Sequence, residues 1–340
     1  MSDPKQPYIG GQAVIEGVMM RAPGCLSVAV RKPDGSIAVR EGPMTSRMAT
    51  SELRRLPFIR GVATLFESLS VGYGALNFSA EQQLTEEERA EMGESSGRLM
   101  MVLTTLFALG LFMAAPQLAA EGTSRLLGVE LAVDEWQFHA LTGGFKLLIF
   151  TLYLFAISRL PDVRRVFQYH GAEHKTIFAY EQGLELTVEN VQKQSTLHPR
   201  CGTTFLIVVI FVSVVAGTFV TPLLMPEWAT GRFEQNLITL LVRIALLPPV
   251  AATSYELQRI SARYFTKGPL QVFLWPGFLF QKITTRQPED DQVEIAIAAM
   301  LAAVWREKNA SAEADEEPLV FESFQTFVSG VKTSLRPQKA

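Results

Sequence analysis

Two long runs of apolar residues that contain no charge dominate the pattern of the chain. They are Leu99 to Ala120, with 22 residues, and Gly202 to Met225, with 24. A helix of either length crosses a hydrocarbon core of about 30 Å, which needs roughly 20 residues. Phe138 to Ser158 and Gln235 to Thr253 are nearly as apolar, each with one cation. A buried core helix rarely reaches such lengths without a polar face, so the pattern predicts about four transmembrane helices.

Basic residues alternate between loops in step with these runs. Lys and Arg number nine in residues 1–60, six in residues 159–201 and ten from residue 254 onward, but one in each of the two remaining loops. Because basic segments stay on the cytoplasmic side, both termini are expected in the cytoplasm. A fifth apolar stretch, Phe58 to Ala80, contains Glu67 and three glycines. As a span it would break the alternation, so residues 58–98 are expected to form an interfacial or re-entrant helix and an acidic linker.

The segments outside the membrane domain, residues 99–256, have patterns of their own. Residues 1–57 alternate around a Pro-Asp-Gly turn and predict a small β-rich cytoplasmic domain. Residues 257–308 predict an interfacial segment and a soluble amphipathic helix, and residues 309–340 a mostly disordered tail with one short amphipathic helix. The fold class is therefore an α-helical integral membrane protein with a β-rich N-terminal cytoplasmic domain and a helical cytoplasmic C-terminal region.

Composition alone would suit a soluble enzyme, and only its distribution along the chain argues otherwise. The 340 residues are 48% hydrophobic and 19% charged, against averages of roughly 45–50% and about 25%. Two cysteines cannot build a disulfide scaffold. A net charge of −3 gives no general affinity for nucleic acid. The expected partner is the lipid bilayer, and no nucleic acid is expected.

Scarce metal-ligating residues crowd into one predicted cytoplasmic loop, residues 159–201. Three of the four histidines, His170, His174 and His198, lie there with Cys201, one of the two cysteines. On a helix His170 and His174 share a face, where two imidazoles can bind one zinc ion. Two residues separate His198 from Cys201, a common ligand spacing. Zinc or iron would suit three nitrogen ligands and one sulfur ligand, and zinc is the expected divalent metal because it demands least of the geometry. Four protein ligands would make the site structural, and an open position would make it catalytic.

Glu173 lies between the two helical histidines. The string His170-Gly-Ala-Glu173-His174 fits the H-x-x-E-H pattern of inverted zinc proteases. In that pattern the glutamate acts as general base, so Glu173 is the candidate catalytic residue. The helix is expected to begin at an N-cap, Asp162, and to stop at Gly183.

Arg200, at the end of this loop, and Glu16, near the N-terminus, are two further candidates. Cys201 is expected at the N-terminus of the third span, next to Arg200, where the helix dipole and the cation favour the thiolate that a metal needs. Glu16 lies in the glycine-rich segment Gly10 to Arg21. That segment is either a tight β-turn or a loop whose glycines bring backbone and a carboxylate to a site.

Lys146 and Arg243 are cations inside predicted spans, where charge is costly and usually functional or paired. Lys146 either snorkels from near the outer end of its span or has a role, and Arg243 is the better candidate for an interior position. Two cations cannot neutralise each other, so a carboxylate, a lipid phosphate or a water cavity is expected nearby. His139 is expected to be a plain interfacial residue, and Pro248-Pro249 to break the fourth span.

Four strings resemble the YqhQ-like family of bacterial membrane proteins: GGQAVIEGVMMR, FQYHGAEHKTIFAYE, LHPRCGTTF and the QKITTRQPEDDQVEIAI region. The resemblance extends from about Gly10 to Ala302, with an arginine associated with the position of Lys146, and the tail after Lys308 matches nothing. The family is described as uncharacterised and as predicted metal-dependent enzymes. The resemblance implies a multi-pass protein of the bacterial inner membrane and supports the metal-site residues of the 159–201 loop, but it supplies no reaction and no substrate.

The sequence favours a metal-dependent hydrolase at the cytoplasmic membrane face, acting on a membrane peptide or a lipid head group. The alternative is a non-enzymatic membrane scaffold or assembly factor, in which a structural metal clamps the loop and a protein partner docks. A third class is a transporter subunit with Lys146 and Arg243 along its path. Four spans are few for transport and no inverted repeat is visible, so that function would need a homo-oligomer.

Overall fold

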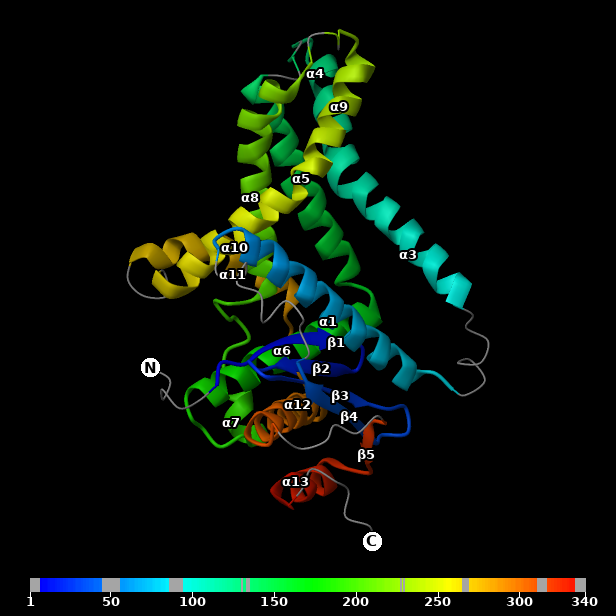
Figure 1. Ribbon diagram of the computed structural model, residues 1–340, viewed down its shortest axis with the longest axis vertical. Helices are drawn as coiled ribbons and strands as arrows, with labels where there is room; N and C mark the ends of the chain where they lie inside the picture. The colour runs from blue at the N-terminus through cyan, green and yellow to red at the C-terminus, as the bar shows by residue number, and fades with distance from the viewer. Residues whose placement is uncertain are drawn as a thin grey trace.

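The computed structural model arranges the chain in two regions, a helical bundle and an α/β region next to it (Figure 1). It describes residues 7–44, 56–85, 94–129, 131–132, 135–226, 228, 230–264, 269–310 and 317–333. The first described strand and the last described helix both lie in the α/β region, on the same side of the bundle (Figure 1).

The predicted β-rich segment forms most of a five-stranded antiparallel sheet whose strands follow chain order. The strands are β1 (Gly10–Val14), β2 (Gly17–Arg21), β3 (Cys25–Arg31), β4 (Ile37–Pro43) and β5 (Leu319–Phe321). The turn between β3 and β4 passes through Gly35, whose φ of 87° is a left-handed conformation that glycine adopts without steric cost. The Pro-Asp-Gly turn is thereby confirmed.

Both faces of the sheet are covered, which explains why its strands are apolar at successive positions. On β2, Val18 and Met20 belong to one core with α6 (Pro161–Glu181) and α12 (Asp290–Lys308). Met19, which points the other way, packs with Phe78 of α1 (Ile59–Gln83). Figure 1 shows α1 on one side of the strands and α12 on the other.

The helix expected to be amphipathic is instead buried almost all round. No residue of α12 from Gln292 to Glu307 is exposed, because the sheet covers one side and α6, α7 (Val188–Gln192) and α13 (Phe324–Thr333) cover the others. Its approach to the sheet is close, with the Ser27 hydroxyl donating to the Ala299 carbonyl at 2.6 Å. The N-terminal strands, α6, α12 and α13, which were predicted to lie in separate parts of the molecule, therefore share one hydrophobic core.

The predicted disordered tail needs correction over residues 317–333. β5 pairs with β4, with Phe321 opposite Ile37, and Phe327 of α13 is fully buried in the core with α12. The expected short helix near residues 320–331 is present, but the strand before it was not predicted. Residues 311–316 and 334–340 lie outside the described residues.

The predicted interfacial helix is α1, which joins the two regions. Its C-terminal half lies on the sheet, where the Ser79 hydroxyl accepts from the backbone N–H of Ile15. Its N-terminal half packs against α10 (Leu247–Tyr264), and Arg60 forms an ion pair with Glu256 at 2.5 Å. An interfacial position in a membrane stays a prediction.

The bundle contains the predicted apolar runs. Its helices are α3 (Glu94–Leu109), the π-helical turn η2 (Gly110–Ala114), α4 (Ala115–Leu126), α5 (Trp136–Ile157), α8 (Gly202–Val220), α9 (Arg232–Ala245) and α10. The 3₁₀ turn η3 (Pro222–Leu224) follows α8 within the bundle, and the 3₁₀ turn η4 (Pro269–Leu274) and α11 (Trp275–Thr284) lead from α10 to the α/β region.

Three of these helical stretches are long and apolar enough to cross a membrane, and a fourth qualifies if one bent pair is a single span. The three are Val102–Leu126, Trp136–Ile157 and Gly202–Val220, and the pair is Arg232–Ala245 with Leu247–Ser261, bent by 48°. The bend falls next to Pro248-Pro249, as predicted, since proline removes a helical hydrogen bond and clashes with the preceding turn.

Candidate metal centre

Helix α6 carries two of the candidate ligands on one face. It begins with Pro161 in its first turn and Leu160 at the N-cap, so Asp162 is a first-turn acid rather than the predicted cap. Its end is as predicted, because Gly183 follows with a φ of 68°. One helical turn separates His170 from His174, and their ring centroids lie 4.4 Å apart.

Each of these two histidines is anchored through its Nδ1 atom. His170 Nδ1 lies 2.8 Å from the Thr284 carbonyl oxygen, and His174 Nδ1 lies 2.5 Å from the Thr196 carbonyl oxygen. A carbonyl only accepts, so each Nδ1 carries a proton and each Nε2 is left with its lone pair. This is how proteins orient histidines that ligate metals through Nε2.

Cys201 supplies a third lone pair at the same place. It is the N-cap of α8, as predicted, and its Sγ accepts from the Thr203 backbone N–H at 3.4 Å. Sγ lies 3.2 Å from His170 Nε2, and one ligand atom each from His170, His174 and Cys201 all lie within 4.8 Å of one another. Ligands around tetrahedral zinc lie on the order of 3.5 Å apart, so the three atoms fit such an ion.

Glu173 is buried beside these three residues. Its Oε2 atom lies 4.0 Å from His170 Nε2. Burial raises the pKa of Glu173, while the nearby His170 and His198 lower it. A Cβ at Gly11 of β1 would lie 2.7 Å from Glu173 Cγ, so only glycine lets the strand approach this closely. Gly11 thus lets the backbone of β1 approach the candidate site.

His198 lies next to the cluster, but its ligand atom is not among the three that converge. Its Nδ1 accepts from the Arg200 backbone N–H at 3.3 Å, so the proton of the neutral ring sits on Nε2 and occupies the position of a metal-binding lone pair. Nε2 lies 3.7 Å from Glu181 Oε2. Burial lowers the pKa of His198 to about 4. This residue borders the site as a neutral hydrogen-bond donor.

The side chain of Arg200 has partners of its own. Its guanidinium pairs with Glu181 and lies over the Tyr8 ring, 4.7 Å from the centroid. The predicted support of the Cys201 thiolate by this cation stays a prediction.

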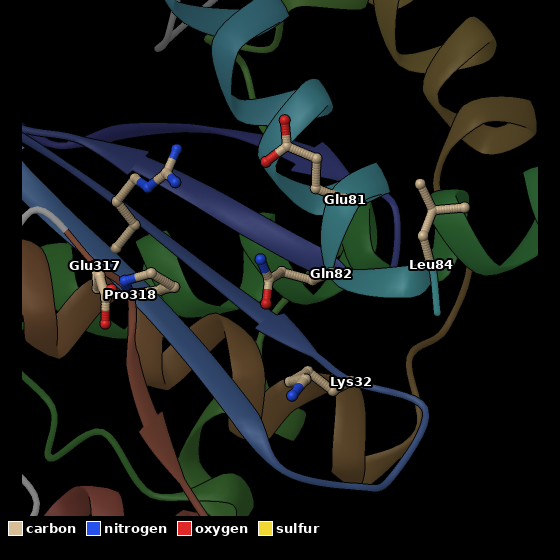
Figure 2. A pocket seen from close by; sticks show the side chains of 7 residues that line it. Lys32, Glu81, Gln82, Leu84, Glu317 and Pro318 are labelled. Atoms are coloured by element: carbon tan, nitrogen blue, oxygen red, sulfur yellow. The ribbon is translucent and has the colours of Figure 1, made fainter. Parts of the chain in front are cut away.

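The cluster opens into a cavity of about 380 Å³ between the N-terminal segment, α6 and the first turns of α8. Its lining combines the titratable residues with apolar side chains such as Ile9, Phe167 and Leu206. A second cavity, of about 370 Å³, lies at the sheet edge near the end of α1, where Lys32, Glu81 and Glu317 surround it (Figure 2). Its lining contains no histidine and no cysteine, so we place the candidate site in the first cavity.

Glu16 does not join the site. Its carboxylate binds Arg165 through two hydrogen bonds of 2.5 and 2.6 Å and accepts from the Tyr169 hydroxyl at 3.2 Å. It occupies the β1–β2 turn with a φ of 49°. The residue fastens that turn to α6, so the sharper of the two predictions for Glu16 is wrong.

The two cations of the bundle meet inside it rather than reaching its ends. Lys146 is the eleventh of the 22 residues of α5 and donates to the Ser213 hydroxyl at 3.1 Å. Arg243 of α9 is buried and binds Gln117 at 3.2 Å and His139 Nδ1 at 3.1 Å. The snorkelling alternative for Lys146 is thus wrong. His139 is only 1% exposed and contacts Arg243, and its interfacial position in a membrane stays a prediction.

Several supporting residues were missed because they act through the backbone. Lys175 is buried and donates to the carbonyls of Gln192 and Gln194 at 2.6 and 2.8 Å, which holds the loop that presents Thr196 to His174. Gln281 of α11 binds both the N–H and the carbonyl of His198. A backbone acceptor has no residue-type signature, so only the position of Lys175 beside His174 could have drawn attention to it.

Comparison with known proteins identifies the family. A family model described as "Protein of unknown function (DUF1385)" matches residues 56–306. The chain is 36% identical over 303 residues to the uncharacterized protein YqhQ of Bacillus subtilis (strain 168), and the match covers 86% of this chain and 90% of that protein. No solved structure matches the chain. The chain therefore belongs to DUF1385, a YqhQ-like family of proteins of unknown function.

Proposed function

We propose that the protein is a metal-dependent hydrolase of the bacterial inner membrane, with its site at the cytoplasmic face. One observation carries the proposal: one ligand atom each from His170, His174 and Cys201 lie within 4.8 Å of one another beside an open cavity. Both imidazole protons are held by backbone carbonyls. Two nitrogen ligands and one sulfur ligand suit zinc, and three protein ligands leave the open position that catalytic zinc sites have.

The proposed chemistry uses the coordination position that the three protein ligands leave open. A divalent ion held there would supply Lewis-acid activation of a water molecule. Glu173 is placed to accept the proton of that water, because its Oε2 lies 4.0 Å from His170 Nε2 and it lines the same cavity. His198, a neutral donor on the far side of His174, is positioned to hydrogen-bond the oxygen of a substrate.

The membrane location is supported by side chains that the bundle leaves exposed. Large apolar side chains project outward from α3, α5 and α8, among them Phe107, Leu152 and Phe211, and lipid would cover them. The alternation of basic loops favours both termini in the cytoplasm. The cavity is lined by the first turns of α8, including Leu206, so the substrate we propose is a membrane peptide or a lipid head group.

The first experiment measures metal in the full-length protein purified in detergent. We expect zinc in the wild type, by elemental analysis, and its loss in His170→Ala and Cys201→Ala. Cys25→Ala is the matched control, because Cys25 is buried in the core of the α/β region and outside the ligand cluster. Wild-type protein that binds neither zinc nor another divalent ion would remove the basis of the proposal.

The second experiment separates a catalytic ion from a structural one. We expect zinc-loaded wild type to hydrolyse members of a panel of p-nitrophenyl esters, p-nitrophenyl phosphates and fluorogenic transmembrane peptides. Glu173→Gln should keep the zinc and lose the turnover. Full zinc occupancy with no turnover in either protein, together with unfolding of Cys201→Ala, would favour the scaffold function instead.

A further inference from the structure

A second polar cluster lies inside the bundle, at about the middle of its helices. Lys146 and Arg243 line one small cavity together with His139, Thr142 and Ser213, and with two glycines, Gly143 and Gly217. Ser213 is the twelfth and Gly217 the sixteenth of the 19 residues of α8, so the cavity extends from the middle of that helix toward its C-terminal end. Groups of this kind are costly in an apolar bundle unless they are paired or used.

The charge in this cavity is not balanced by any residue that lines it. The lining contains two cations and no carboxylate. Within the described bundle, hydrogen bonds lead from Arg243 through Gln117 and Asn236 to Glu121. That acid already pairs with Arg125 at 2.5 Å. Its charge is therefore shared, and two amide side chains separate it from Arg243.

The donors of Lys146 are also incompletely used. An ammonium group has three N–H donors, and Ser213 accepts one of them. The Ser213 hydroxyl donates a hydrogen bond to the Ile210 carbonyl at 2.8 Å, so its oxygen is free to accept from the ammonium group of Lys146. Among the described residues no other acceptor for Lys146 is found. The cavity thus presents unfilled N–H donors and uncompensated positive charge.

The size of the cavity limits what can supply the missing charge. Its volume is about 10 Å³, which is room for roughly one water-sized particle. A phosphate or a carboxylate is too large, and a water molecule carries no charge. We propose that this cavity binds a single monatomic anion, chloride under ordinary conditions, between Lys146 and Arg243.

Gly217 gives a variant that fills the cavity and keeps every charge. A Cβ at Gly217 would lie 3.6 Å from His139 Nδ1 and 4.0 Å from Arg243 Nε, which is ordinary contact, so Gly217→Ala should fold. Gly144→Ala is the matched control, because Gly144 is exposed on α5 and a Cβ there meets nothing within 4 Å. A second pair is Lys146→Met with Lys282→Met, whose lysine is exposed on α11.

The test is equilibrium dialysis of full-length protein in detergent against radioactive chloride, with gluconate holding the ionic strength constant. We expect a single chloride per wild-type chain, displaced by bromide, and unchanged binding in Gly144→Ala and Lys282→Met. Affinity should fall by roughly tenfold or more in Gly217→Ala and Lys146→Met, since each removes space or a buried charge partner. A wild type that binds no chloride has water in the cavity, and binding that survives in both variants places the ion elsewhere; either result overturns the proposal.

Discussion

The two polar clusters of the molecule use histidine in opposite ways. In the α/β region, His170 Nδ1 donates a hydrogen bond to a backbone carbonyl, so the lone pair of Nε2 faces the site. In the bundle, His139 Nδ1 accepts from Arg243, so the lone pair is consumed and the cavity is lined by cations. The partner of one ring nitrogen, more than the residue type, decides whether a cluster attracts a cation or an anion.

The clusters also differ in what holds them. Backbone groups fix the α/β cluster: the Thr284 and Thr196 carbonyls orient the imidazoles, and Gly11 packs on Glu173. Side chains such as Gln117 and Ser213 fix the bundle cluster. Backbone supports are rigid and costly to disturb, whereas side-chain supports can be changed one at a time.

The largest effect we expect separates the two clusters completely. Cys201→Ala should lower zinc affinity by roughly 100-fold or more, since it removes a ligand where even a supporting residue is worth about 10- to 100-fold. It should leave chloride binding unchanged, and Arg243→Gln should do the reverse. Elemental analysis and chloride dialysis on the same preparations measure both. Loss of both ions in either variant would mean that the clusters are not independent.

The next effect tests whether backbone contact holds the α/β cluster. A Cβ at Gly171 would lie 2.0 Å from the Arg286 carbonyl oxygen, so Gly171→Ala must push α6 away from that segment. We expect a loss of about 2 kcal/mol in the free energy of unfolding, measured by denaturant titration. Gly144→Ala in the bundle should instead gain roughly 0.5 to 1 kcal/mol, because it removes a flexible residue from a helix. Equal changes in the free energy of unfolding for the two variants would show that close backbone contact does not distinguish the α/β cluster from the bundle.

A smaller effect should follow from loosening the loop behind His174. Lys175→Met removes the two hydrogen bonds to the Gln192 and Gln194 carbonyls while leaving all three ligand atoms in place. We expect zinc affinity to fall by about tenfold, as for other supporting residues of metal sites, measured by competition with a chelator. Lys193→Met is the control, because Lys193 is exposed and pairs with Glu189 one helical turn away. If the two variants bind zinc equally, the loop does not position His174.

The last effect is confined to alkaline pH and concerns Cys25. Burial, with help from Glu307, raises the pKa of Cys25 from 9.0 to about 12. The folded state then holds a proton that the unfolded state releases, so stability is complete below pH 9 and falls as the pH rises from about 9 to 12. Thermal unfolding of wild type and Cys25→Ala across this range measures the difference. A stability curve of the same shape in both proteins would show that Cys25 does not contribute.

Much of the fold follows from local pattern. The β3–β4 turn needed only its Pro-Asp-Gly string, and the bend near Pro248 needed only the prolines. β5 was missed because three residues, Leu319 to Phe321, carry no periodicity and depend on pairing with β4. The all-round burial of α12 was missed for the same reason. Its neighbours come from the sheet and from helices far away in the sequence.

The candidate site divides in the same way. His170, His174, Glu173 and Cys201 were predicted from spacing, and the structure brings them together. The acceptor for His170 lies 114 residues away, at Thr284, which spacing cannot reveal. His198 was predicted as a ligand from its spacing and from the family resemblance, but its Nδ1 accepts from the Arg200 backbone N–H, so that lone pair is not available to a shared ion. Proton placement is a tertiary property, so residue type alone could not supply it.

The position of Cys201 as the first residue before α8 has a mechanical consequence. Its sulfur travels with the bundle, while His170 and His174 travel with the α/β region. An ion that binds all three residues would link the bundle to the α/β region. Any tilt of α8 would then change the distance between the sulfur and the two imidazoles. By thermodynamic reciprocity, whatever tilts α8 alters the affinity for the ion, and the ion resists the tilt with the same free energy. Metal affinity would then report the orientation of the bundle relative to the α/β region.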